Sequence, residues 1–471
     1  MTKDLTTGSP MKLILSFGIP VLLGNLFQQF YNVVDTAIVG KTLGGDALAA
    51  VGSTGSINFL VVGFCMGICG GFAIPVAQQF GAGDHRELRR YVTGGTWLCL
   101  LFGGLLTLAT VLLCGDILTA MQTPIEIYGR AYRYILTIFA GLPAYFLYNF
   151  TAGVLRSLGD SRTPVIWLSA AAVLNIVLDV VFILCFHMDV FGAALATVLS
   201  QAVAGAGCLW RVLRGYPILH TAREDWRWER RRMGELCLMG LPMGLQYSIT
   251  AVGSIVLQTA VNALGSVYVT AVSTGSKVYQ LIACPFDAMG AAMATYCGQN
   301  VGAGRLDRLR QGVRSCSLLG LGYSAAALVA MLFFAPQCAM LFLNSGEEQF
   351  QLLVGLTSQY TVTLTAFFFP LALVNILRFS IQGMGFSTLA ILAGVLEMIA
   401  RAVVGQFFVP AMGYTAACFA SPAAWICADL FLIPACLGCI AHLRRSSPTA
   451  GLETISRDAA GRRGWKKSFG T

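Results

Sequence analysis

Charged side chains are scarce in this sequence. Asp, Glu, Lys and Arg make up 11% of its 471 residues, whereas soluble domains contain roughly 25%. Hydrophobic residues account for 56% of the chain, so there are too few polar side chains to cover a surface in contact with water. This composition excludes an ordinary soluble protein and indicates an integral membrane protein.

Histidine is also rare, and its four copies are scattered in or beside expected loops. No serine–base pair or carboxylate cluster at a membrane face accompanies them, so the sequence contains no catalytic constellation. The 15 cysteines lie mostly in apolar runs, where Cys acts as a small apolar residue. Cys436 and Cys439 form a CxxC pair, but without a βαβ context it does not indicate a redox or metal site. We expect a protein that is not an enzyme and needs no cofactor.

Long apolar runs, in contrast, are abundant. Runs of about 20 mainly apolar residues indicate membrane-spanning helices. The sequence contains twelve such runs and therefore predicts an all-α integral membrane protein with twelve transmembrane helices. Their approximate ranges are 13–39, 48–78, 92–114, 131–155, 164–187, 191–213, 235–263, 268–298, 313–343, 351–382, 388–411 and 413–442.

The two halves of the chain are copies of one another. The hexapeptide QQFGAG at 78–83 returns as QNVGAG at 299–304, and STGS at 53–56 returns letter for letter at 273–276. Because each half has an even number of spans, both enter the membrane from the same side, and their symmetry axis runs along the membrane normal. The sequence therefore predicts two pseudo-symmetric six-helix bundles, a construction typical of secondary transporters.

The basic residues predict the orientation and the domain boundaries. All but six of the 31 Lys and Arg residues lie in the termini or in the loops after spans 2, 4, 6, 8 and 10, which places both termini in the cytoplasm of a plasma (inner) membrane protein. This asymmetry also accounts for most of the +9 net charge, so we expect contact with membrane lipids and no nucleic-acid partner. The predicted domains are an N-lobe at 1–213, a cytoplasmic linker at 214–233, a C-lobe at 234–442 and a disordered basic tail at 443–471.

The linker and the paired glycine-rich turns have structural interpretations. The linker is rich in Arg and contains two Trp residues, and we expect a short amphipathic helix that lies on the membrane. The Gly-Ala-Gly turns follow membrane helices rather than strands, so they indicate repeated turns or hinges and not a nucleotide-binding loop. Pro20 and the glycine-rich stretch from Gly63 to Gly71 are candidate bending points; the alternative is helix packing through small residues.

Carboxylates inside predicted spans are costly and mark candidate functional sites. Glu397 and Arg401 are four residues apart in the order that favours an intrahelical ion pair, so a structural role is the simpler interpretation. Asp287 can pair with Lys277 or cap backbone groups freed by the preceding proline. Asp429 has no obvious partner nearby in the sequence. These residues are possible secondary polar sites.

Four polar residues of the first half are predicted to share one depth in the membrane. Span 1 places Asp35 near its outer end, and span 5 places Asn175 and Asp179 on successive turns of one helix face. Span 6 begins outside, so Thr197 reaches a similar level. Such a set suits Na⁺, or two carboxyl groups that share protons. The alternative is that Asp35 only touches the external interface and that Asn175 and Asp179 join helices.

The second copy provides an internal comparison. The positions that match Asp35, Asn175 and Asp179 are Leu257, Arg401 and Gly405. The acidic layer is therefore absent from the second half, and we expect any ion chemistry to be concentrated in the first lobe.

These features resemble the multidrug and toxic compound extrusion (MATE) transporters over about residues 10–442. The resemblance implies two lobes around a central cleft and export of bulky, amphipathic, often cationic compounds in exchange for H⁺ or Na⁺. It also implies a first-lobe cation site, since an Asp of span 1, an Asn-x-x-x-Asp pair of span 5 and a Thr of span 6 match the family's motif. Some relatives carry further carboxylates on spans 7 and 10, where this chain has Leu257 and the stretch 375–378.

We expect such a transporter to work as a monomer on small organic substrates, by alternating access of its two lobes. The nearest alternative is a lipid-linked oligosaccharide flippase of a related transporter family. A flippase cleft that holds pyrophosphate needs many basic residues, and the spans offer only Lys277, Arg378 and Arg401. The sequence therefore favours the antiporter.

Overall fold

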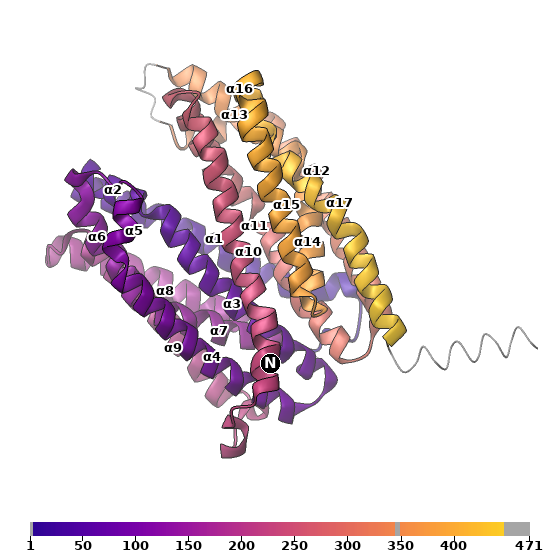
Figure 1. The fold of residues 1–471 in the computed structure, drawn as a ribbon. Helices are drawn as coiled ribbons and strands as arrows, with labels where there is room; N and C mark the ends of the chain where they lie inside the picture. Colours follow the sequence, from indigo (N-terminus) through magenta and orange to yellow (C-terminus); the bar gives the residue numbers. More distant parts are fainter. Residues whose placement is uncertain (1–2, 344–348, 447–471) are drawn as a thin grey trace, which may run out of the picture.

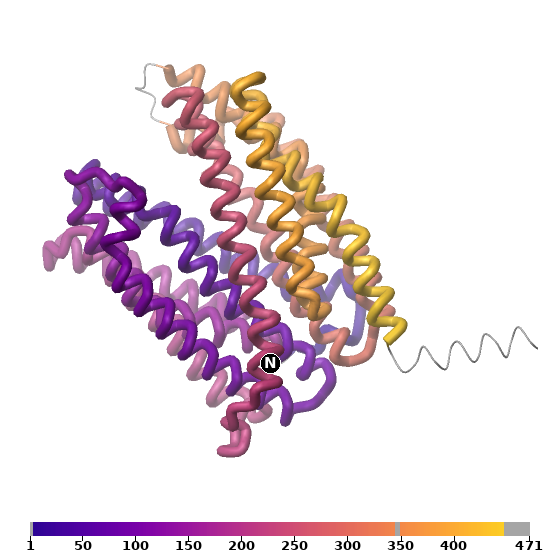
Figure 2. Tube along the Cα trace, viewed as in Figure 1, coloured from indigo at the N-terminus to yellow at the C-terminus, as the bar shows by residue number. Residues whose placement is uncertain are grey.

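The computed structural model describes residues 3–343 and 349–446. Every regular element in these two ranges is helical. Figure 1 shows two helical bundles, the N-terminal one in indigo to magenta and the C-terminal one in rose through orange to yellow, which meet at one end and diverge at the other. The chain enters the first bundle and leaves α17 at the end where the bundles meet, which we call the closed side (Figure 2).

The first bundle, or N-lobe, is built from long helices that are broken at two places. A 43° bend separates α6 from α7, where Pro143 lacks the N–H that would continue the hydrogen-bond ladder. The elements are α1 (Pro10–Leu43), α2 (Gly45–Ser53), α3 (Gly55–Ala82), α4 (His85–Leu112), α5 (Cys114–Ala120), α6 (Ile125–Ala140), α7 (Leu142–Ser157), α8 (Arg162–Val180), the π-helix η1 (Val181–Cys185) and α9 (Asp189–Gly215).

The second bundle, or C-lobe, repeats these breaks. A 51° bend separates α13 from α14, near Pro370, which is the counterpart of Pro143. The π-helix η4 follows α15, just as η1 follows α8. The elements are α10 (Arg230–Asn262), α11 (Ser266–Gly302), α12 (Leu306–Met340), α13 (Phe350–Ala366), α14 (Phe368–Gly383), α15 (Ser387–Val403), η4 (Val404–Phe408), α16 (Val409–Met412) and α17 (Tyr414–Ser446).

Each of the twelve predicted spans corresponds to one helix or to a helix that is broken into two or three elements. Nine helices of the described ranges are long and apolar enough to cross a membrane, and the two bent pairs raise the number to eleven. The remaining span is α11, which has 37 residues and carries Lys277 and Asp287. The prediction of an all-α membrane protein with two six-helix bundles is confirmed.

Glycines bring the two lobes into backbone contact along α3 and α10. A Cβ atom on Gly67 would lie 2.5 Å from the carbonyl oxygen of Met243, and one on Gly71 would lie 2.5 Å from the Cα of Gly240. α3 is a continuous helix, so these glycines permit close packing between the lobes. Both contacts lie near the middle of α3.

The two copies of the repeated hexapeptide pack against each other at the closed side. A Cβ on Gly81 would lie 2.0 Å from the carbonyl oxygen of Gln299, and one on Gly302 would lie 1.7 Å from that of Gln78. Gln78 donates its amide to Gly383 O across 3.2 Å. The repeat therefore forms part of the contact that holds the lobes together, in addition to making two turns.

The linker differs from its prediction. Two short 3₁₀ turns, η2 (Pro217–Leu219) and η3 (Arg223–Trp226), replace the expected amphipathic helix. The reason is that the linker folds onto α4: Asp225 is 4% exposed, and Thr93 Oγ1 donates to its carbonyl oxygen across 2.6 Å. α17 continues to Ser446, so the first residues of the predicted tail are helical. The rest of the tail, from residue 447, lies outside the described residues.

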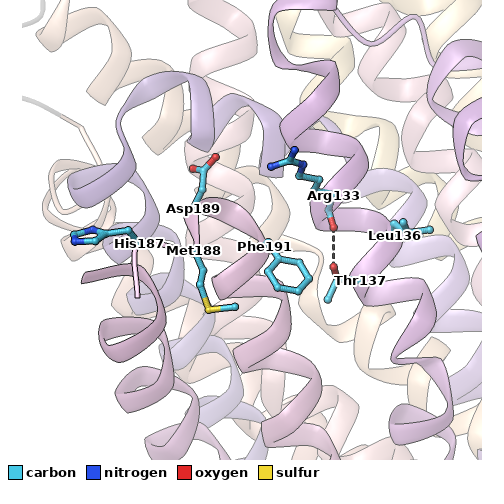
Figure 3. Close-up of a pocket in the computed structure, with 7 residues that line it drawn as sticks. All are labelled: Arg133, Leu136, Thr137, His187, Met188, Asp189 and Phe191. Carbon is cyan, nitrogen blue, oxygen red and sulfur yellow. Dashed lines mark hydrogen bonds between the residues drawn. The ribbon is translucent and has the colours of Figure 1, made fainter. Parts of the chain in front are cut away.

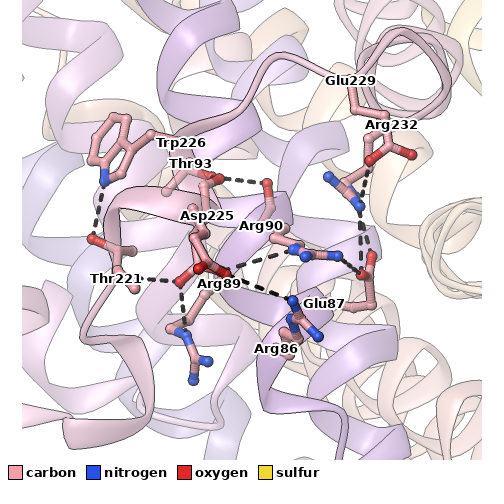
Figure 4. A network of polar contacts seen from close by, with 12 residues as sticks. Arg86, Glu87, Arg89, Arg90, Thr93, Thr221, Asp225, Trp226, Glu229 and Arg232 are labelled. Carbon is pink, nitrogen blue, oxygen red and sulfur yellow. Dashed lines mark hydrogen bonds and ion pairs between the residues drawn. The ribbon is translucent and has the colours of Figure 1, made fainter.

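Ion pairs fix the linker to the N-lobe (Figure 4). Arg89 Nε lies 3.1 Å from Asp225 Oδ2, and Arg232, in the first turn of α10, pairs with Glu87 of α4 across 3.1 Å. Burial of Asp225 acts to raise the pKa of its carboxyl. The backbone N–H of Ala222 and the side chain of Arg89 outweigh this effect, and the pKa is lowered from its usual 3.8.

Candidate cation site

The predicted polar layer lies where α1, α8 and α9 meet in the N-lobe. Asp35 comes from α1, and Thr197 comes from α9. Asn175 and Asp179 come from successive turns of α8; they are 1% and 0% exposed, respectively. The carboxyl groups of Asp35 and Asp179 lie close enough for their charges to interact. The structure thus brings together the four side chains selected from the sequence.

Both ends of α8 have special geometry. At its start, Asp160 Oδ1 accepts the backbone N–H groups of Arg162 and Thr163 across 3.1 and 3.0 Å. Burial acts to raise the pKa of Asp160, but hydrogen bonds from Thr163 and Tyr216 outweigh it and lower the pKa. At its other end, the π-helix η1 begins two residues after Asp179. Wide π turns of this kind are frequent at functional sites.

The side-chain amide of Asn175 links α8 to α9. With its nitrogen directed at Asp179, it donates to Oδ2 across 3.3 Å, and its oxygen accepts the backbone N–H of Thr197 across 3.2 Å. The opposite orientation would place the amide oxygen against an acceptor, so the hydrogen-bond network assigns the first one. Asn175 thereby orients the carboxylate of Asp179.

A small cavity adjoins this layer. It has a volume of about 10 Å³, and a cavity needs roughly 10–15 Å³ to hold one water molecule. Three polar residues that the sequence analysis did not select contribute to it: Tyr31, Ser200 and Gln201. Their spacing was a usable signal, because Tyr31 precedes Asp35 by one turn and the other two follow Thr197 by one turn. The lining residues are Tyr31, Leu168, Ala171, Ala172, Asn175, Thr197, Ser200 and Gln201.

Several oxygen atoms of this region have no hydrogen-bond partner among the described residues. They are Asp35 Oδ1, Asp179 Oδ1, Ser200 Oγ and Gln201 Oε1. Buried polar atoms are rarely left unpaired unless water or an ion satisfies them. Carboxylate, amide and hydroxyl oxygens are the ligands that hard cations prefer, and two adjacent carboxyl groups can also share a proton. The arrangement can therefore bind a small cation or exchange a proton.

A larger recess of about 500 Å³ lies beyond the cation layer, at the end of the N-lobe away from the closed side. Figure 3 shows it between the start of α9 and α6, with Phe191 and Arg133 among its lining residues. Asp189 in its wall pairs with Arg130 across 2.9 Å. None of the four layer residues lines this recess, so its size does not make it the ion site.

The second lobe has a buried ion cluster at the corresponding depth. Arg401 Nη2 lies 3.3 Å from Glu397 Oε2, which confirms the predicted intrahelical pair. Arg378, from α14, contacts the other oxygen of Glu397, a partner that the sequence analysis did not identify. All three side chains are at most 8% exposed. The basic candidates Arg378 and Arg401 thus share one carboxylate, that of Glu397, which offsets one of their two charges.

The other two acidic candidates lie apart from the first lobe's layer. Asp287 forms no ion pair among the described residues, so the suggested pairing with Lys277 is wrong. The two residues are ten positions apart on the continuous helix α11, which separates them by about 15 Å along its axis. Asp429 is 7% exposed, and it lies within reach of the charges of Arg378 and Glu397.

The chain matches one family over both of its halves. The MatE family model covers residues 20–181 and 242–407, and these two blocks correspond to the two copies of the internal repeat. Together they make up well over half of the chain.

Curated relatives include transporters with different cargo. The probable multidrug resistance protein YpnP of Bacillus subtilis is 29% identical over 79% of this chain and 82% of its own length. A second B. subtilis protein of this description, YoeA, is 30% identical over 70% of this chain and 73% of its own length. The FAD transporter of Shewanella oneidensis is 23% identical over 78% of this chain and 80% of its own length.

Solved structures share the fold over nearly the whole chain. A crystal structure of MATE in complex with MaL6 has a TM-score of 0.87 at 22% identity, over 95% of this chain and 100% of that chain. An outward-facing multidrug resistance MATE family transporter has a TM-score of 0.87 at 21% identity, with the same coverage.

Proposed function

Because this chain belongs to the MatE family of multidrug efflux transporters, we propose that it is a secondary active antiporter. It exports bulky, amphipathic, often cationic organic compounds in exchange for H⁺ or Na⁺. The observation that carries this proposal is the proximity of the carboxyl groups of Asp35 and Asp179 in a layer with unpaired oxygen atoms. Two carboxylates this close repel each other unless a proton or a metal cation lies between them.

The paired carboxyl groups supply a means of coupling. Asp35 is on α1, and Asp179 is on α8, so a cation that binds between them draws the two helices together. When the cation leaves, repulsion in a site shielded from water favours their separation. An ion can drive transport only if it binds the two states of the lobes with different affinity. The change in α1–α8 packing provides that difference.

The orientation of the lobes fits one state of an alternating-access cycle. The basic loops predict a cytoplasmic N-terminus in the plasma membrane, and the N-terminus lies at the closed side (Figure 1). The lobes therefore diverge toward the outside, and the state described is outward-open. The cargo would leave from this state, and the cation would enter.

A polar stripe on α11 supports a cargo path between the lobes. Ser273, Lys277, Gln280 and Asp287 are all exposed, and their spacing places them on one side of the helix. Lipid-facing positions are normally apolar, and α11 contacts α1 and α3 of the N-lobe. The stripe thus fits a water-filled cleft, where Asp287 is available to a cationic cargo.

The test is efflux of a cationic dye from lipid vesicles that contain the purified monomer. A pH gradient and a Na⁺ gradient are imposed separately, with the membrane potential clamped. Antiport predicts dye movement against its own gradient under one of the two conditions. Movement of dye only down its gradient, whichever ion gradient is imposed, would refute the proposal. Translocation of a fluorescent polyprenyl-pyrophosphate lipid under the same conditions would favour the flippase.

A further inference from the structure

Residues 3–8 form a short segment before α1 that lies on the closed side of the molecule. We call this segment the strap. Leu5 is 1% exposed and belongs to the hydrophobic core of the C-lobe, although the strap precedes the first helix of the N-lobe. Thr6 is 8% exposed. The strap is thus inserted into the lobe to which it does not belong in sequence.

The C-lobe holds the strap by the backbone of Leu5 and Gly8. The N–H of Leu5 donates to Gln299 Oε1 across 2.9 Å, and its carbonyl oxygen accepts from Asn300 Nδ2 across 3.2 Å. Arg308 Nη2 donates to the carbonyl oxygen of Gly8 across 2.8 Å. Two of these three partners belong to the second copy of the repeated hexapeptide, and both are fully buried. We call Gln299, Asn300 and Arg308 the cradle.

The strap is joined to the N-lobe at both of its ends. At one end, the N–H of Lys3 donates to Leu158 O across 3.0 Å. A Cβ on the neighbouring Gly159 would lie 2.1 Å from Lys3 O, and its φ of +80° also favours glycine. At the other end, the strap continues directly into α1. Gln299 of the cradle also bonds to the N-lobe directly, since its Nε2 donates to Ser157 O across 2.8 Å.

The linker makes the reciprocal arrangement. It precedes the first helix of the C-lobe, yet Asp225 is bound by Arg89 and Thr93 on α4 of the N-lobe (Figure 4). The strap likewise contacts Arg308 on α12, which is the counterpart of α4. The segment that leads into each lobe therefore binds the third long helix of the other lobe. The linker leads into the C-lobe and binds α4, and the strap leads into the N-lobe and binds α12. For the linker this is unavoidable, because it must connect the lobes, whereas the strap has no such constraint.

We propose that the strap is a latch that stabilises the state closed on the N-terminal side and leaves the cradle before that side opens. This inference rests on the proposed alternating access. Only one residue lies between Lys3, held by the N-lobe, and Leu5, held by the C-lobe. Two residues of extended chain span at most about 7 Å, so the segment cannot follow both lobes as they separate. Opening therefore breaks one set of contacts and, if the cradle lets go, exposes Leu5 to water.

The test measures the separation of the lobes directly. Spin labels are placed on the exposed positions Arg86 of α4 and Arg310 of α12, in full-length protein whose exposed cysteines Cys185 and Cys427 are replaced by Ser. Electron–electron distances are recorded at several pH values, with and without Na⁺ and dye. Leu5→Ser removes the buried anchor, and Arg308→Ala removes the contact with Gly8. Thr7→Ala is the matched control, because Asp4, within the strap, is the only hydrogen-bond partner of the Thr7 side chain among the described residues.

The latch predicts that Leu5→Ser and Arg308→Ala each raise the ratio of long to short distances about tenfold, equivalent to about 1.4 kcal/mol. Thr7→Ala should leave the ratio as in the wild type. If the wild-type ratio responds to pH, Na⁺ or dye but neither strap variant changes it, the latch is refuted and alternating access stands. If the wild type and all variants show a single distance between the labels under every condition, alternating access itself is refuted. Size-exclusion profiles identify a variant that has not folded. If Leu5→Ser misfolds, Arg308→Ala still tests the latch, because Arg308 lies outside the hydrophobic core.

Discussion

Gln78 and Gln299 hold the two lobes together in the same way from opposite sides. Gln78, on α3, donates its amide to Gly383 O in the C-lobe across 3.2 Å. Gln299, on α11, donates to Ser157 O in the N-lobe across 2.8 Å. The two acceptors are themselves counterparts, at the ends of α14 and α7. The internal repeat has therefore kept a contact between the lobes, and the predictions below begin from it.

Replacing Gly302 with Ala should weaken the closed side. The new Cβ would lie 1.7 Å from the carbonyl oxygen of Gln78, and a backbone atom cannot move aside as a flexible side chain can. Overpacking of this kind costs about 1–3 kcal/mol. We expect a lower melting temperature in detergent and a larger separation between labels on Arg86 and Arg310.

Gly322→Ala on α12 is the control for this change. No atom lies within 4 Å of the position where its Cβ would be, and Ala is favoured over Gly in a helix by up to about 1 kcal/mol. We expect its melting temperature to be equal to or above that of the wild type. If Gly302→Ala behaves like this control, the backbone contact between the repeats is not part of the closed side.

Glu397→Gln should destabilise the C-lobe strongly. Glu397 pairs with both Arg378 and Arg401 and offsets one of their two charges, and the side chains of this cluster are 4% to 8% exposed. Removing one member of a buried ion cluster leaves uncompensated charge and costs about 3–5 kcal/mol. Thermal unfolding checks this, with Glu224→Gln as the control, because the Arg86–Glu224 pair is 63% and 73% exposed and such pairs contribute at most about 1 kcal/mol. Equal melting temperatures for the two variants would contradict the structural role of Glu397.

Docking of the linker should depend on the ionisation of Asp225. The pKa of this carboxyl is lowered from 3.8, so its contribution is fully present above that value and is lost as the pH falls through the lower, folded pKa. At pH 6, we expect Asp225→Asn to be cut faster than the wild type by a protease that attacks residues 216–229. The difference between Asp225→Asn and the wild type should shrink only below pH 3.8. At that pH, hydrogen exchange of the linker is measured in place of proteolysis. A wild type that loses protection between pH 5 and 7 would show that another group controls docking.

The sequence was a sufficient guide to the spans, because twelve apolar runs and an internal repeat depend only on composition and spacing. It also placed Asp35, Asn175 and Asp179 at one depth, since the rise of a helix fixes the depth of each residue. Rise alone does not say which faces of two helices meet. Tyr31 and Gln201 lie one turn from Asp35 and Thr197, but uncharged polar residues on helices are common in ordinary packing, so that spacing becomes decisive only once the facing sides of α1 and α9 are known.

Contacts between distant segments were the least predictable. Arg378 and Glu397 are on different helices, so their pairing has no periodic signal, unlike the four-residue spacing of Glu397 and Arg401. The linker looked like an amphipathic helix because its Arg and Trp residues suit a membrane surface. In the structure, Asp225 instead bonds to side chains of α4. The strap has the composition of a polar terminus, and only the burial of Leu5 reveals its role.

The central claim is that a cation bound between Asp35 and Asp179 drives export, and gradient-driven efflux by carboxamide variants tests it most directly. Asp35→Asn and Asp179→Asn are compared with Asp46→Asn, whose carboxylate is exposed near the end of α1, in vesicles with equal amounts of protein. We predict that both layer variants lose accumulation of dye against its gradient while dye binding persists, and that Asp46→Asn transports like the wild type. Full gradient-driven efflux in both layer variants would contradict the account.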